Sequence, residues 1–88
     1  MVTCYASTKH GIVGLTKAMC DELAQFNVQV NTIAPGYFKT ELTEETRNDE
    51  EKNQTILSHI PADRWGDKAD LMGACVFLAS SASDYVNG

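Results

Sequence analysis

The sequence of 88 residues has no apolar run of about 18 residues, which is the length that a membrane-spanning helix needs. Its first residues, Met1 to Tyr5, lack the basic region followed by an apolar region that is typical of a signal peptide. We therefore expect a cytoplasmic protein that does not span a membrane.

Cysteines are few, and their spacing is poor for cross-linking or metal binding. There are three, an odd number, and no two form a C-x-x-C pair. This pattern argues against a disulfide framework and a structural zinc site. We expect reduced thiols at Cys4, Cys20 and Cys75 and no bound metal.

Basic residues are outnumbered: the chain has 7 Lys and Arg against 12 Asp and Glu, for a formal net charge of -5. Phosphate backbones and anionic lipid surfaces repel such a chain, so we expect no nucleic-acid or membrane partner. The composition, 43% hydrophobic and 22% charged, is typical of a globular sequence.

Hydrophobic spacing predicts about three helices. The first runs from Ser7 to Phe26, where apolar residues recur three and four apart, and Asn27 suits a left-handed stop. The second begins at a cap on Asn48 and ends before Pro61. The third runs from Asp67 to about Ala79, and its broad apolar arc predicts burial.

One strand is predicted at residues 28–33, a short β-branched segment that ends at the turn 34–36. A lone strand leaves its backbone hydrogen bonds unmade, and a strand between two helices is typical of a parallel sheet. The pattern therefore predicts a piece of a larger α/β domain whose other strands lie outside this sequence.

Tyr5 and Lys9 are the residues with the clearest catalytic chemistry. A spacing of four places both side chains on one face of a helix. An ammonium beside a phenol favours the phenolate, and such a tyrosine can exchange a proton with a carbonyl oxygen or an alcohol. Without further context, the pair is more typical of an ordinary surface contact.

Further motifs follow this Y-x-x-x-K segment in a fixed order. They are V-N-x-I-x-P-G at 30–36, P-G-x-x-x-T at 35–40, R-x-G-x-x-x-D-L at 64–71 and V-F-L-A-S-x-x-S-x-x-x-x-G at 76–88. Over nearly its whole length the chain resembles the short-chain dehydrogenase/reductase family. The resemblance implies that residues 1–88 are the C-terminal fragment of a doubly wound, Rossmann-type parallel-sheet domain of the α/β class.

The resemblance also implies a role for each matching residue. Tyr5 would be the general acid/base, and Lys9 would hold the nicotinamide ribose hydroxyls and tune Tyr5. The cofactor would be NAD, with NADP left open, and it would contact Tyr5, Lys9, Pro35, Gly36, Phe38 and Thr40. Thr40 has a competing interpretation as a helix cap only.

The acid-rich segment from Glu41 to Ile60, called the lid segment below, corresponds to the mobile cover of the family's substrate site. Trp65 is expected to be a packing anchor beneath it rather than a substrate platform. Tyr37 fits substrate contact and packing on the lid segment equally well.

Within the family, residues 19–24 and 35–43 resemble gluconate 5-dehydrogenases. Residues 47–51, 56–57, 60–66 and 77–88 instead resemble 2-deoxy-D-gluconate 3-dehydrogenases. We favour the second resemblance because the lid and C-terminal segments lie nearest the substrate. Both imply hydride transfer between a nicotinamide cofactor and a secondary alcohol or ketone of a sugar acid. Lys39 and Arg64 are candidates to bind its carboxylate, and the family resemblance implies a homo-tetramer.

The sequence departs from the family pattern before Tyr5, where no glycine-rich phosphate loop occurs. The family's serine and asparagine partners of the tyrosine are missing too, as is the last strand. We therefore expect the 88-residue chain alone to be inactive. Two alternatives stay open: a truncated product that only associates with other chains, and a small helical binding module.

Overall fold

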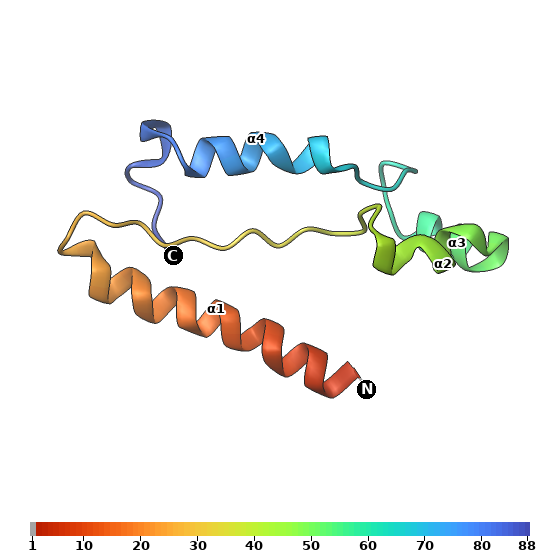
Figure 1. Cartoon of the computed structure of the whole chain (residues 1–88), viewed down its shortest axis with the longest axis horizontal. Coiled ribbons are helices and arrows are strands. Elements are labelled where there is room, and N and C mark those ends of the chain that lie inside the picture. The colour runs from red at the N-terminus through yellow and green to blue at the C-terminus, as the bar shows by residue number, and fades with distance from the viewer. Residues whose placement is uncertain (1) are drawn as a thin grey trace. The chain divides into compact units, whose positions relative to one another are not determined.

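The computed structural model describes residues 2–88 (Figure 1). Its helical elements are α1 (Val2–Ala24), η1 (Glu41–Thr43), α2 (Glu44–Asn48), α3 (Glu50–Ser58), α4 (Lys68–Leu78) and η2 (Ser81–Ser83). The chain divides into two compact units. The first combines the chain up to Ile33 with Val76–Gly88, and the second is Ala34–Cys75.

Helix α1 is longer at its start than the sequence predicts. It begins at Val2 rather than Ser7, because the intervening residues include no glycine or proline to break it. At its end Asn27 has a φ of 57°, which confirms the predicted left-handed stop. The N–H groups of Asn27 and Val28 donate to the carbonyls of Ala24 (2.9 Å) and Leu23 (3.3 Å), a Schellman arrangement that ends the helix.

The predicted strand at residues 28–33 is wrong for this chain: no β-strand occurs within residues 2–88. The segment is extended and is drawn without an arrow (Figure 1). A strand needs a partner to complete a ladder, and the described residues supply none. Instead, the Val30 N–H donates to Asn87 Oδ1 (2.8 Å), and the Gly88 N–H donates to the Val30 carbonyl (2.9 Å).

Helix α3 begins one residue later than predicted. Its N-cap is Asp49, whose Oδ1 accepts a hydrogen bond from the Lys52 N–H at 3.1 Å, while Asn48 is the last residue of α2. A carboxylate also suits the positive end of the helix dipole better than an amide does. Helix α4 follows Asp67 directly, as predicted, and ends at Leu78, one residue before Ala79.

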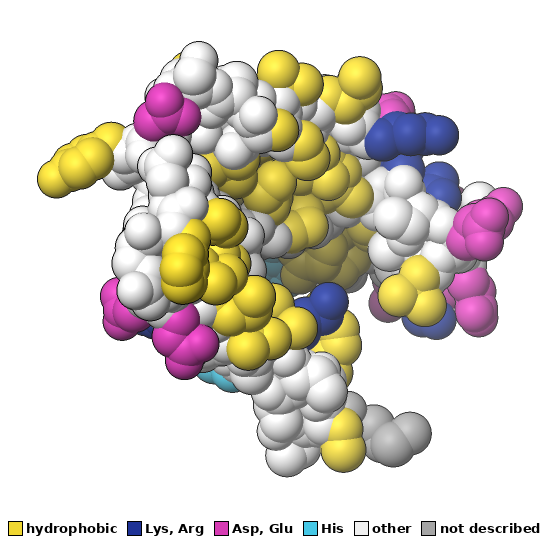
Figure 2. Space-filling view, turned by 60° about the vertical axis from the view of Figure 1, so that its left-hand side comes forward, with side chains coloured by type: hydrophobic (Ala, Val, Ile, Leu, Met, Phe, Trp, Pro, Cys, Tyr) yellow, Lys and Arg dark blue, Asp and Glu magenta, His cyan; other side chains and the backbone are white. Residues whose placement is uncertain are grey.

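The predicted burial of α4 is wrong, because no residue of α4 is buried. Met72 and Val76 are 62% and 67% exposed, since the described residues provide no sheet for this face to pack on. In α1, Ile12 and Leu15 are likewise exposed. Hydrophobic side chains are accordingly prominent on the visible surface (Figure 2).

No helix in residues 2–88 combines the length and the apolar character that crossing a bilayer requires. The three cysteines are unpaired. The described residues contain no group of three or more metal-ligating side chains close enough to share an ion.

Candidate active site

Tyr5 and Lys9 lie one turn apart near the start of α1, and the structure brings them together. The Lys9 Nζ is 5.5 Å from the centroid of the Tyr5 ring, within the range of a cation–π contact. Tyr5 is 63% exposed, so its hydroxyl is open to another molecule. Ser7 cannot act as its partner, because the Ser7 hydroxyl donates to the Thr3 carbonyl at 2.8 Å.

The other predicted site residues, Pro35, Gly36, Phe38 and Thr40, belong to the second unit. Phe38 forms an isolated parallel bridge with Gly66. The Lys39 N–H donates to the Gly66 carbonyl (2.9 Å), and the Gly66 N–H donates to the Tyr37 carbonyl (2.8 Å). These two bonds fix the backbone on either side of Phe38.

Thr43 holds the same segment from the lid side. Its hydroxyl donates to the Phe38 carbonyl (2.9 Å) and accepts from the Thr40 N–H (3.0 Å). Arg47 donates from Nη2 to the Thr40 carbonyl (3.1 Å). Thr40 occupies the N-cap position of η1, although its side chain makes no capping hydrogen bond. Its side chain stays exposed, which also leaves it free for a ligand.

Arg64 is committed to the start of α4. Its Nη1 and Nη2 donate to the two carboxylate oxygens of Asp70 at 2.7 and 2.9 Å. This hydrogen bonding holds the pKa of Asp70 well below its usual range and raises the pKa of Arg64. Asp70 also accepts from the Asp67 N–H at 2.7 Å. Since the guanidinium fork is occupied, Arg64 is a poor candidate for a substrate carboxylate.

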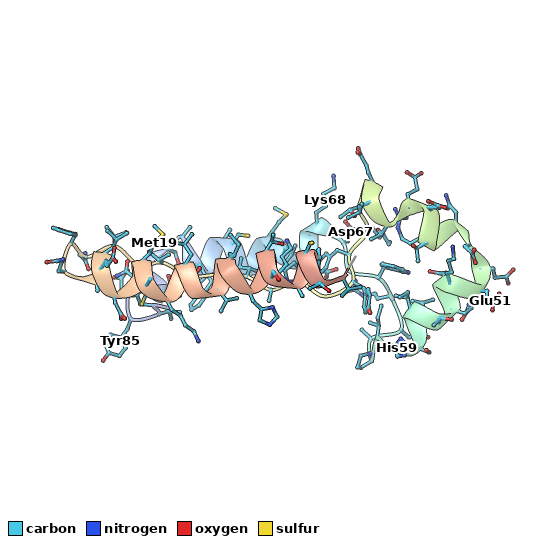
Figure 3. All side chains as sticks on the ribbon, turned by 90° about the horizontal axis from the view of Figure 1, so that it is seen from below. Met19, Glu51, His59, Asp67, Lys68 and Tyr85 are labelled. Carbon is cyan, nitrogen blue, oxygen red and sulfur yellow. The ribbon has the colours of Figure 1, made fainter. Side chains whose placement is uncertain are left out.

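Lys39 is the freer of the two predicted cations. Its Nζ lies 3.9 Å from a carboxylate oxygen of Asp67, and both side chains are about half exposed. A loose surface pair of this kind is worth little and exchanges readily. Asp67 and the neighbouring Lys68 are labelled at the start of α4 in Figure 3.

Trp65 is the one buried hydrophobic residue among residues 2–88, with 7% exposure, which confirms its prediction as a packing anchor. Its indole Nε1 donates to Asn53 Oδ1 at 2.7 Å. Tyr37 meets its ring edge-on, with the centroids 5.9 Å apart and the planes at 80°. Tyr37 is nevertheless 47% exposed, so packing and substrate contact are compatible.

Sequence reasoning missed four residues that build this site: Thr43, Arg47, Asn53 and Asp70. Thr43 had a usable signal, because it stands three residues after Thr40 in capping-box spacing. Asn53 had none, since its partner is 12 residues away and only the folded chain brings the two together.

Comparison with known proteins places the chain in a family. The family model described as "Enoyl-(Acyl carrier protein) reductase" matches residues 1–88, and the chain belongs to this family of short-chain dehydrogenases and reductases. Its curated relatives include the uncharacterized oxidoreductase YgcW of Escherichia coli (strain K12), 64% identical over 84 residues, 96% of this chain and 32% of the relative.

A second relative is the 2-dehydro-3-deoxy-D-gluconate 5-dehydrogenase of the same strain, 54% identical over 87 residues, 99% of this chain and 34% of the relative. Among solved structures, a candidate 2-deoxy-D-gluconate 3-dehydrogenase from Agrobacterium tumefaciens with bound NADP has a TM-score of 0.90 at 51% identity. That match covers 94% of this chain and 34% of that protein. The chain thus spans about a third of the length of these relatives.

Proposed function

We propose that residues 1–88 supply the acid/base pair and the substrate lid of a nicotinamide-dependent sugar-acid dehydrogenase. The observation that carries the proposal is the exposed Tyr5 with the Lys9 ammonium 5.5 Å from its ring, on the helix where the family has its Y-x-x-x-K segment. The family match over the whole chain and the names of the relatives support it.

The described residues fit a nicotinamide cofactor. The Phe38 N–H has no hydrogen-bond partner within residues 2–88, and the Thr40 side chain is exposed, so a carboxamide or phosphate oxygen would meet two donors. At Gly36 the space where a Cβ would stand has no atom within 4 Å, which leaves room for a flat ring. Lys9 would hold ribose hydroxyls.

When bound, the nicotinamide supplies the hydride in reduction or accepts it in oxidation. In reduction, the Tyr5 hydroxyl gives its proton to the carbonyl oxygen of the substrate; in oxidation, the phenolate takes the proton from the alcohol. The Lys9 ammonium lies 5.5 Å from the centroid of the Tyr5 ring and places a positive charge beside it. The lid segment covers the substrate and excludes water.

Sugar acids are the substrate class that the relatives' names favour. The name of the E. coli relative gives position 5 of the sugar acid, and the name of the solved A. tumefaciens protein gives position 3. The resemblance of residues 47–66 to 2-deoxy-D-gluconate 3-dehydrogenases favours position 3, and oxidation at position 5 is the alternative. Lys39 is the cation that we assign to the substrate carboxylate.

Two chimeras test the function and the position together. Residues 1–88 replace the matching segment of the E. coli 5-dehydrogenase in one and of the A. tumefaciens protein in the other. Each is assayed with NAD and NADP on sugar acids oxidised at position 3 or 5. We expect both to turn over and both to prefer position 3. Inactivity of both, beside active unaltered hosts, would refute the function.

The 88-residue chain alone is the third arm of this experiment. We expect no turnover from it, because residues 1–88 contain no glycine-rich loop for the pyrophosphate. The exposed apolar residues Ile12, Leu15 and Met19 on α1 fit either a core that other segments complete or a contact between subunits. We also propose a homo-oligomer for the active protein, which light scattering of the chimeras would reveal.

A further inference from the structure

The bond between Asn53 and Trp65 ties the lid segment to the remainder of the second unit. Asn53 is a half-buried residue of α3, and its Oδ1 accepts from the Trp65 Nε1 at 2.7 Å. Among the side-chain hydrogen bonds within residues 2–88, it is the one that joins α3 to a distant segment. A buried indole N–H without an acceptor is costly, so this partner matters.

Trp65, which Asn53 holds in place, in turn contacts the ring of Tyr37. The edge of one ring meets the face of the other at a centroid distance of 5.9 Å, an arrangement that aromatic quadrupoles favour. The Tyr37 carbonyl is fixed at the same time by the Gly66 N–H at 2.8 Å. Tyr37 thus has one orientation set by its backbone and its ring, while 47% of the residue stays exposed.

The place of Asn53 in the helix agrees with a positioning role. Asparagine is a weak helix former, so in the middle of α3 it costs stability unless its amide is used. The next residue, Gln54, is exposed and makes no side-chain hydrogen bond within the described chain. Glu51 and His59, labelled in Figure 3, lie at opposite ends of this helical stretch and are exposed.

We propose that Asn53 is a positioning residue that, through Trp65, holds both the lid segment and the Tyr37 ring in place for the sugar-acid substrate. This role rests on the proposed function. Tyr37 is the exposed member of the contacts that run from Asn53 through Trp65. Asn53 affects the affinity for the substrate. It does not take part in the proton transfer, which belongs to Tyr5 on α1.

The kinetic test compares Asn53→Leu, Asn53→Asp and the matched control Gln54→Leu in the chimera with the E. coli host. For Asn53→Leu we expect KM for the sugar acid to rise about tenfold, equivalent to about 1.4 kcal/mol, with kcat and cofactor affinity within about twofold. Asn53→Asp keeps an acceptor oxygen and should restore most of the loss. An Asn53→Leu variant with the KM of Gln54→Leu would overturn the proposal.

A second readout does not depend on activity. Trp65 is the only tryptophan of the 88-residue chain, so its fluorescence reports the environment of this residue alone. In the 88-residue chain, we expect acrylamide quenching of Trp65 to increase about twofold or more in Asn53→Leu and to stay unchanged in Asn53→Asp and Gln54→Leu. Equal quenching in all variants would show that the Asn53–Trp65 hydrogen bond does not hold Trp65 in its buried position. Increased quenching in the 88-residue Asn53→Leu variant, beside chimeras without any turnover, would support the Asn53–Trp65 bond but refute the proposed function and with it the role in substrate binding.

Discussion

Replacing Gly66 with alanine should destabilise the protein, because the new Cβ would meet the Phe38 ring. An ideal Cβ on Gly66 lies 2.8 Å from both Cε1 and Cζ of Phe38, well inside van der Waals contact. Two backbone bonds of 2.8 and 2.9 Å hold these segments together, so the backbones cannot easily separate. The ring must turn, and overpacking of this kind costs about 1–3 kcal/mol.

Gly73→Ala is the matched control, since no atom lies within 4 Å of the Cβ that it adds to α4. Alanine in a helix interior is favoured over glycine by about 0.8–1 kcal/mol, so this variant should be stabilised. The two changes therefore have opposite signs in urea unfolding followed by circular dichroism. In a thermal melt each kcal/mol corresponds to roughly 4–8 °C. A Gly66→Ala variant as stable as Gly73→Ala would refute the packing described for Phe38.

Three further predictions concern the polar contacts of the second unit. Asp49→Ala removes the α3 cap and should lower the free energy of unfolding by about 0.5–2 kcal/mol, whereas Asn48→Ala should change it by less than about 0.5 kcal/mol; urea midpoints would decide. The pKa of Asp70 is lowered in the folded state, chiefly by its hydrogen bond from Arg64, so its contribution is complete above the unfolded value of about 3.9 and is lost as the pH falls through the folded value. The Asp70→Asn variant should therefore be less stable at pH 7, and its free energy of unfolding should depend less on pH below about 4. Unfolding measured from roughly pH 2 to 7 would show both effects. Arg64→Gln should leave KM for the sugar acid within about twofold in either chimera, and a rise of about a hundredfold would instead make Arg64 a carboxylate ligand.

The helices could be predicted because caps and stop signals depend on only a few neighbouring residues. The left-handed Asn27 and the start of α4 after Asp67 follow from local chemistry alone. The α3 cap was displaced by one residue because Asn48 and Asp49 are both good cap residues, and the carboxylate is the one that captures the Lys52 N–H. Boundaries are decided by such small differences.

The predicted strand failed for the opposite reason. Its β-branched sequence describes a segment that fits a sheet, but a strand exists only with a partner. In this chain the Val30 N–H and carbonyl bond to Asn87 and Gly88, some 57 residues away in sequence for the Asn87 contact. The burial predicted for α4 failed for the same reason, because it depends on a sheet that the described residues do not form.

In the candidate site, the motif predicted Tyr5 and Lys9, and their helix spacing was enough to bring them together. The contacts that fix the second unit were not predictable, because Asn53–Trp65 and Arg64–Asp70 each join a helix to a loop residue without a recognisable spacing. Arg64 looked like a free cation in sequence, and only the structure pairs it.

The central claim is that Tyr5 is the proton donor and acceptor of a nicotinamide-dependent dehydrogenase. The most direct measurement is the turnover of sugar acids by the chimera with the E. coli host, in which Tyr5 is the tyrosine of the Y-x-x-x-K segment, compared with its Tyr5→Phe variant. We predict a loss of kcat of at least about 100-fold with an unchanged circular dichroism spectrum and cofactor affinity. A Tyr5→Phe chimera with full activity would contradict the account.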